Sequence, residues 1–171
     1  MRKTILGAAT ATVLATAALA APGAAEAATS RVNYVHSTGV CQPATPLELG
    51  GLRFRPLGIF NNKTTAIYIS CTLDTELVGT YNLTDISIYF DNQGNVGRTV
   101  ECTAVGGRRG VATSSVAGDA VLSANSGGTI YFNDVDRVSS SYTAYGISCL
   151  LPPKVEMGMI RMMEVDAGDG L

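Results

Sequence analysis

The stretch Thr65–Leu73, TAIYISCTL, alternates apolar and polar side chains in the way that a β-strand with one buried face does. Ile67 and Cys71 fall on one face of such a strand, while Tyr68 and Ser70 fall on the other. The strand also contains a cysteine. The stretch therefore predicts a half-buried strand in a disulfide-stabilised β-domain.

The triplet Ile67-Tyr68-Ile69 recurs as Ile88-Tyr89-Phe90 and Ile130-Tyr131-Phe132. In each triplet the tyrosine points away from its two apolar neighbours. If the three strands lie side by side in one sheet, Tyr68, Tyr89 and Tyr131 form a stripe that could stack on sugar rings or anchor a protein partner. Ordinary cross-strand pairing is the alternative, and the absence of tryptophan favours it.

Apolar runs separated by turn residues predict further strands over 31–36, 83–91, 98–105, 129–132, 145–151 and 155–165, whereas 111–122 has small residues and only weak alternation. The turn residues at 91–95 predict a β-hairpin that joins strand 83–91 to strand 98–105. After residue 27, no apolar set recurs at helical spacing over ten residues. The sequence therefore predicts an all-β, antiparallel β-sandwich or jelly-roll-like domain of about seven to nine strands.

The N-terminus has the three parts of a secretory signal peptide. Arg2 and Lys3 form the positive region, Ile5–Ala20 the apolar region, and Ala25–Ala27 a small-residue cleavage site. The apolar region is alanine-rich and shorter than a membrane span requires. We expect a signal peptide over 1–27, a single domain over 28–165, a flexible tail over 166–171, and a secreted or periplasmic protein.

All four cysteines, Cys41, Cys71, Cys102 and Cys149, follow the expected cleavage site. An even number of cysteines in an exported chain predicts two disulfides, and four cysteines allow three pairings. The pairing Cys41–Cys71 with Cys102–Cys149 is favoured because its closures are local.

Four cysteine-containing segments carry a further signal: Cys41–Ala44, Cys71–Leu73, Val100–Cys102 and Tyr145–Pro153. Together they resemble small four-cysteine, β-sandwich-like proteins exported by bacteria. The resemblance implies a fold and a compartment, and it transfers no catalytic residue.

Composition and motifs disfavour several functions. The formal net charge of −2 and the lack of a basic cluster disfavour nucleic acid as a partner. No long apolar run follows the signal region, so no membrane span is expected. His36 is the only histidine and no GxSxG serine occurs, which disfavours a nucleophilic triad. The carboxylate pairs at 74 and 76 and at 134 and 136 are interpreted as solvated turn residues rather than as glycosidase or calcium groups.

Methionines cluster in the segment 157–163. On a regular strand Met157, Met159 and Met163 share a face with Arg161, while Met162 points away. Thioether ligands suit Cu(I), so copper handling is an alternative function. Core packing is favoured, because methionine fills cores and the arginine is a poor neighbour for a metal ion.

These patterns predict a non-enzymatic binding or structural module without a cofactor. Polysaccharide or cell-surface material is the candidate partner. A copper-handling protein is the first alternative, and a secreted enzyme is the second.

Overall fold

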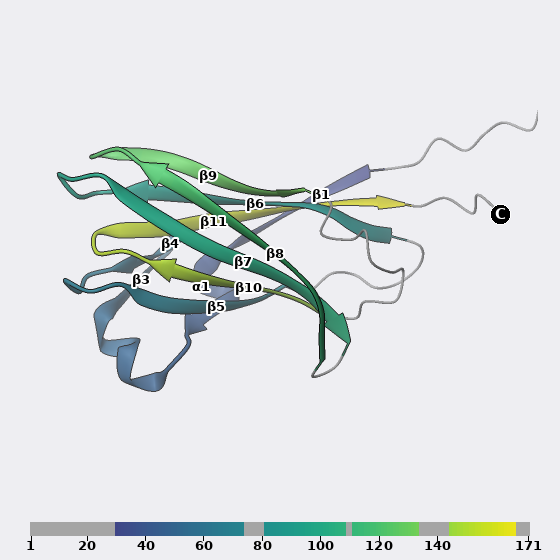
Figure 1. The fold of residues 1–171 in the computed structure, drawn as a ribbon, viewed down its shortest axis with the longest axis horizontal. Helices are drawn as coiled ribbons and strands as arrows, with labels where there is room; N and C mark the ends of the chain where they lie inside the picture. Colours follow the sequence, from purple (N-terminus) through teal and green to yellow (C-terminus); the bar gives the residue numbers. More distant parts are fainter. Residues whose placement is uncertain (1–29, 74–80, 109–110, 134–143, 167–171) are drawn as a thin grey trace, which may run out of the picture.

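The computed structural model describes residues 30–73, 81–108, 111–133 and 144–166 (Figure 1). The predicted signal peptide and the tail beyond Asp166 lie outside this part of the chain. The described strands are β1 (Ser30–His36), β2 (Cys41–Pro43), β3 (Leu52–Arg55), β4 (Gly58–Asn61), β5 (Ile67–Leu73), β6 (Tyr81–Asn92), β7 (Arg98–Arg108), β8 (Val111–Leu122), β9 (Ser126–Asn133), β10 (Ala144–Leu151) and β11 (Val155–Asp166). Two short helices, α1 (Ser37–Val40) and the 3-10 helix η1 (Pro46–Gly51), flank β2.

The strands form two antiparallel sheets that pack face to face (Figure 1). Sheet A has the order β3-β4-β11-β6-β9, and β1 also pairs with β11. Sheet B has the order β2-β5-β10-β7-β8. The predicted antiparallel β-sandwich is confirmed.

The core lies between the two sheets and follows from the alternation of side chains along the strands. In β5 the burial pattern alternates strictly, with Ile67 and Ile69 buried and Tyr68 exposed, as the sequence predicts. Ile88 of sheet A and Ile147 of sheet B are buried in the same layer. Each sheet therefore has one apolar inner face and one outer face.

The disulfides are Cys41–Cys71 and Cys102–Cys149, so the favoured pairing is confirmed. In each bridge the two cysteines are direct partners on neighbouring strands of sheet B. The first bridge joins the short edge strand β2 to β5, and the second joins β7 to β10. Both bridges therefore tie strands within one sheet, and neither crosses the core.

The predicted hairpin between strands 83–91 and 98–105 is wrong. β6 belongs to sheet A, where it pairs with β11 and β9, whereas β7 belongs to sheet B, where it pairs with β10 and β8. The residues 93–97 therefore cross from one sheet to the other. Polar turn residues suit both kinds of connection, and both strands still bury one face, so local periodicity does not distinguish them.

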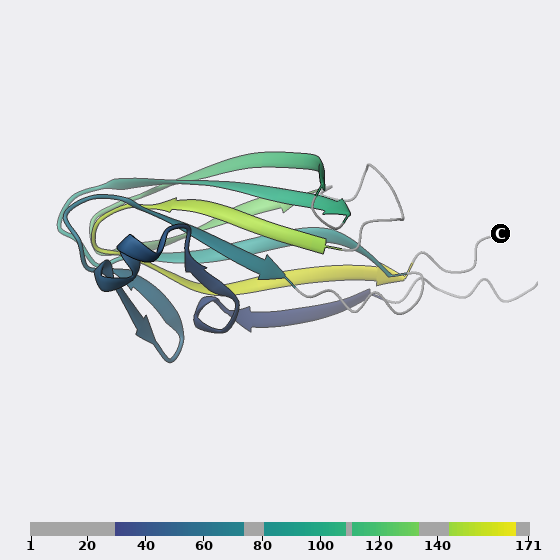
Figure 2. The ribbon, with the colours of Figure 1, turned by 90° about the horizontal axis from the view of Figure 1, so that it is seen from below.

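The segment between β1 and β5 contains short strands and a 3-10 helix that the sequence pattern did not predict, because proline and glycine interrupt the alternation there. β3 and β4 form a short hairpin, and with η1 they lie at the end of the sandwich away from the C-terminal end of β11 (Figure 2). With β2 these short strands bring the described total to eleven, where the sequence indicated seven to nine. None of the described helices is long and apolar enough to cross a membrane.

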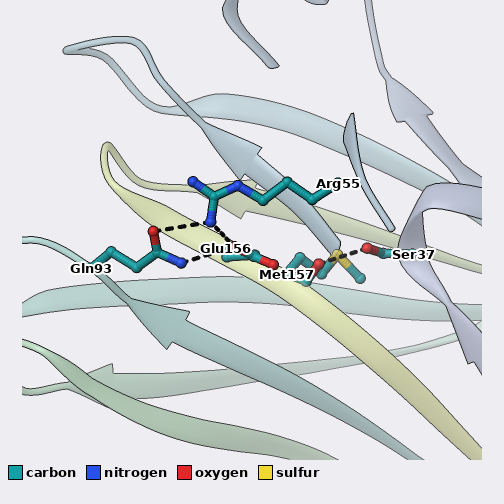
Figure 3. Close-up of polar contacts among 5 residues, drawn as sticks. All are labelled: Ser37, Arg55, Gln93, Glu156 and Met157. Carbon is teal, nitrogen blue, oxygen red and sulfur yellow. Dashed lines mark hydrogen bonds and ion pairs between the residues drawn. The ribbon is translucent and has the colours of Figure 1, made fainter. Parts of the chain in front are cut away.

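Polar contacts attach the edge elements to β11. Arg55 of β3 and Gln93 both donate hydrogen bonds to the carboxylate of Glu156 (Figure 3). The buried hydroxyl of Ser37 in α1 donates to the backbone carbonyl of Met157 at 2.6 Å, beside a bulge in β11. Arg31 of β1 forms an ion pair with Glu164, a buried residue of β11.

Two buried asparagines organise the turns at one end of the sandwich. The side-chain amide of Asn61 donates to the carbonyls of Thr65 and Leu151, both at 2.9 Å. The amide of Asn92 donates to the carbonyls of Val96 and Ser123 at 2.9 and 2.8 Å. Each side-chain carbonyl also accepts a backbone N–H two residues along the chain. Each asparagine therefore satisfies three backbone groups at once.

Candidate functional site

The outer face of sheet B carries a groove of about 410 Å³. It extends across β5, β10, β7 and β8. The lining residues with the clearest binding chemistry are Tyr68, Glu101, Thr103, Asp119, Ser148 and Leu150. The volume falls within the range of small-molecule binding sites, which is about 300–1,000 Å³.

Strand register arranges the lining residues in rows. Tyr68 is the Cα partner of Leu150, Leu150 of Glu101, and Glu101 of Asp119. Because neighbouring strands lie about 4.8 Å apart, the row runs about 14 Å across the sheet. A second row, beside the first, contains the hydroxyls of Thr103 and Ser148. The groove thus has a tyrosine ring at one side, two carboxylates at the other, and hydroxyls between.

Glu101 and Asp119 make this groove electronegative. Both side chains are exposed and stand directly opposite each other on β7 and β8. Like charges in direct opposition destabilise a sheet. Among the described residues that line the groove, none is a lysine, arginine or histidine. Glu101 and Asp119 are therefore an unfavourable pair for the stability of the sheet, and the same two carboxylates present hydrogen-bond acceptors in the groove.

Sequence reasoning missed this carboxylate pair. The alternation of β7 does predict that Glu101 points away from the buried Cys102. However, β8 is rich in small residues with weak alternation, so the face of Asp119 is hard to assign. Its position opposite Glu101 depends on the pairing of β7 with β8, which the local pattern does not encode.

The predicted stripe of Tyr68, Tyr89 and Tyr131 is wrong, because Tyr68 lies on a different sheet from the other two. Tyr68 lies on sheet B, with 54% of its surface exposed, and lines the groove. Tyr89 and Tyr131 lie on neighbouring strands of sheet A, where their register is diagonal: Tyr89 opposes Thr129, and Tyr131 opposes Ser87. The two sheets present their outer faces to opposite sides, so Tyr68 points away from the other two tyrosines.

Another tyrosine completes a cluster on sheet A. Tyr34 of β1 opposes Arg161 of β11, Arg161 opposes Ser87, and Ser87 opposes Tyr131. Tyr34 and Tyr131 are 58% and 65% exposed. We call this surface the tyrosine face. Its residues are Val32, Tyr34, Asp85, Tyr89, Tyr131, Met159, Arg161 and Met163.

The methionine arrangement predicted for copper is wrong. Met157 is fully buried in the core, and so is Met162, whereas Met159 and Met163 are partly exposed on the tyrosine face with Arg161. The reason is the bulge in β11 between Met157 and Ile160, which reverses the alternation of the residues that follow. Met157, Met159 and Met163 therefore do not share a face and do not form one ligand set.

The remaining candidate groups do not assemble into a second site within the described ranges. His36 is exposed at the end of β1. Among the residues that the structure describes, no group of three or more histidine, cysteine, aspartate or glutamate side chains is placed to hold a metal ion. The carboxylate pairs at 74 and 76 and at 134 and 136 lie outside the described residues.

A second hollow of about 390 Å³ lies between β2, η1 and β3. Its lining is mostly apolar and includes Pro43, Pro46, Leu49 and Phe54, with Gln42 as a polar member. It offers few groups that could orient a polar ligand. The groove on sheet B is therefore the better candidate for recognition of a polar ligand.

Comparison with known proteins yields distant structural similarities only. No protein-family model matches the chain, and no curated protein matches it. One similar structure is a carbohydrate-binding module, CBM36, in complex with calcium and xylotriose, with 11% identity over 76% of this chain and 98% of that chain and a TM-score of 0.41. A mannan-recognising module, TmCBM27, has 9% identity over 80% of this chain and 98% of its own, with a TM-score of 0.46. A structure of infectious bursal disease virus, Gx strain, has 12% identity over 82% of this chain and 33% of that chain, with a TM-score of 0.49.

Proposed function

We propose that this chain is an exported, non-enzymatic module that binds neutral polysaccharide in the groove on sheet B. The observation that carries the proposal is the row formed by Tyr68, Leu150, Glu101 and Asp119 across four strands. Export agrees with the two disulfides, which are typical of oxidising compartments.

The aromatic end of the row suits the apolar C–H face of a sugar ring, and its carboxylate end suits the sugar hydroxyls. The C–H face of a pyranose is apolar and can stack on the exposed ring of Tyr68, which carries a large apolar surface. The hydroxyls of the sugar can donate to the carboxylates of Glu101 and Asp119, which are acceptors when ionised. Thr103 and Ser148 can donate or accept between them.

The charge of the groove selects among polysaccharides. Glu101 and Asp119 repel a uronic acid or a sulfated sugar, and within the part of the chain that the structure describes no lysine or arginine lines the groove to offset this repulsion. Neutral sugars present only hydroxyls and escape the penalty. The ligand class that we propose is therefore a neutral glycan, and acidic glycans are disfavoured.

The positions of the carboxylates favour binding over cleavage. A glycosidase needs two carboxyl groups that flank the scissile bond, one acting as acid and the other as base or nucleophile. Glu101 and Asp119 stand side by side on adjacent strands of a single sheet face. They are thus placed to contact one side of a bound chain rather than to enclose a bond.

Replacing Tyr68 by alanine is expected to weaken binding at least tenfold, because the variant loses the stacking ring while the buried face of β5 is unchanged. A tenfold change corresponds to about 1.4 kcal/mol, within the range of an aromatic anchor. Isothermal titration with soluble neutral polysaccharides such as xylan, mannan, mixed-linkage glucan and galactan measures the affinity. Polygalacturonate serves as the acidic comparison.

Tyr131→Ala is the matched control, because Tyr131 is similarly exposed but lies on the opposite sheet. Measured with a short neutral oligosaccharide that occupies a single groove, its affinity is expected to stay within twofold of the unmodified protein. Equal losses in both variants, or no binding to any neutral polysaccharide, would refute the groove as the site. Release of reducing ends during incubation would instead identify a hydrolase.

A further inference from the structure

The tyrosine face has the residue types of a protein interface. Tyr34 and Tyr131 are more than half exposed, and Tyr89 is 37% exposed. Aromatic residues, methionine and arginine are enriched at protein interfaces, and tyrosine and arginine recur among the residues that contribute most to binding. These side chains point away from the core, so packing of the sandwich does not account for their apolar character.

Arg161 sits near the centre of this face without a carboxylate partner among the described residues. Its only recorded side-chain contact there is with the sulfur of Met163, at 3.8 Å. By contrast, Arg31 and Arg55 are each paired with a glutamate. A half-buried guanidinium beside Tyr34, Met159 and Met163 is well placed to receive a carboxylate from a partner, because the apolar surroundings strengthen the ion pair once water is excluded.

The same face offers such a carboxylate. Asp85 of β6 opposes Met163 and lies one row along the sheet from Arg161. Within the described part of the chain, Asp85 forms no recorded ion pair. A two-fold axis uses the same patch on both subunits, so each contact occurs twice. Among the described residues, this face carries a cation without a carboxylate partner at its centre, Arg161, and an anion without an ion-pair partner in its end row, Asp85, so it is complementary to a second copy of itself.

We propose that the tyrosine face is a self-association surface, on which two copies of this chain pack face to face with Arg161 of each copy opposite Asp85 of the other. The apolar contact comes from Tyr34, Tyr89 and Tyr131 with the adjoining methionines.

The size of the face sets the strength of the contact. The outermost of its four strands are about 14 Å apart, and the patch is about five residues, or 17 Å, long. This surface is smaller than the roughly 800 Å² that each partner buries in a standard interface. The dimer is therefore weak, with a dissociation constant in the micromolar range or above.

Such a dimer would raise the affinity of the groove for a polymer, an effect that rests on the proposed function. Packing through sheet A leaves the groove on sheet B free in both copies, and the two grooves face outward on opposite sides. A dimer then holds two glycan chains, or two stretches of one chain. Binding of the second stretch becomes intramolecular, which raises the overall affinity for a polymer.

Sedimentation equilibrium of the exported, disulfide-bonded protein from about 1 μM to 1 mM tests the self-association. The weight-average mass is expected to rise from that of the monomer toward twice that value. Arg161→Asp and Asp85→Arg are each expected to lower the association constant at least tenfold, because each places two like charges opposite each other. The double variant Arg161→Asp/Asp85→Arg restores the pair in reversed order and is expected to return the association constant to within about threefold.

Tyr68→Ala, on the other sheet, is the control and is expected to leave the association unchanged. Circular dichroism shows whether each variant is folded. If a charge variant is not folded, Tyr131→Ser is tested in its place. A protein that stays monomeric to 1 mM would overturn the proposal, as would folded reversal variants that associate normally or a double variant that fails to recover. Polysaccharide binding lost in Tyr131→Ala but not in Tyr68→Ala would assign the face to a glycan and would also overturn it. Because these measurements use no polysaccharide until that last comparison, self-association and glycan binding can fail separately.

Discussion

Replacing Cys102 and Cys149 together by alanine is expected to lower the free energy of unfolding by about 4 kcal/mol. The bridge closes a loop of 47 residues, and the chain-entropy model assigns roughly this value to a loop of that length. For a domain of this size the loss corresponds to a fall in melting temperature on the order of 10 °C. Urea unfolding and a thermal scan of the unreduced protein measure the two quantities.

The Cys41→Ala/Cys71→Ala variant is the informative comparison. That bridge closes 30 residues, so the entropy model predicts a similar loss of about 3.5 kcal/mol. All four cysteine side chains are buried on the inner face of sheet B, whereas the groove lies on its outer face. We therefore expect both variants, where they remain folded, to bind polysaccharide as the unmodified protein does. A melting temperature within 2 °C of the unmodified protein in both variants would show that neither bridge stabilises the native fold as described.

Asn61→Ala is expected to lower the free energy of unfolding by about 3 kcal/mol or more. The side chain is fully buried and donates to two carbonyls, those of Thr65 and Leu151, while its own oxygen accepts the N–H of Lys63. Alanine leaves these three groups without a partner, and each unsatisfied buried group costs about 1–3 kcal/mol. Denaturant titration followed by circular dichroism provides the measurement.

Asn62→Ala is the matched control for this experiment. Asn62 is the next residue along the chain, is exposed, and accepts only a 3.4 Å contact from Lys154. Its replacement is expected to change the stability by less than about 0.5 kcal/mol, as is usual at the surface. If the two variants differ by less than 1 kcal/mol, the asparagine network does not hold the turns together.

Much of the secondary structure was predictable, because the regular strands show a local alternation of buried and exposed side chains. Strand β5 and the strands 98–105 and 145–151 alternate strictly, and their predicted inner residues, such as Val100 and Ile147, are buried. The segment 41–61 was not predictable in the same way. Its strands are only three or four residues long, and proline and glycine interrupt every pattern there.

The candidate site was predictable only in part. Tyr68 was identified because the alternation of β5 places its ring outward. Its partners in the groove, Glu101 and Asp119, depend on which strands pair and in what register. The methionines show the same limit, because one bulge in β11 after Met157 places Met159 and Met163 on the opposite face from Met157, which is buried in the core.

By itself, the sequence determined the all-β class, the inner face of the regular strands and the favoured disulfide pairing, because each follows from the two-residue period of a strand or from the spacing of cysteines along the chain. Only the tertiary structure decided which sheet each strand joins. That choice separates Tyr68 from Tyr89 and Tyr131, places Tyr34 on the same face of sheet A as those two, and sets Glu101 opposite Asp119. The physical reason is that a strand buries the same apolar face whichever sheet it joins. Contacts between residues distant in the chain therefore decide which strand it pairs with.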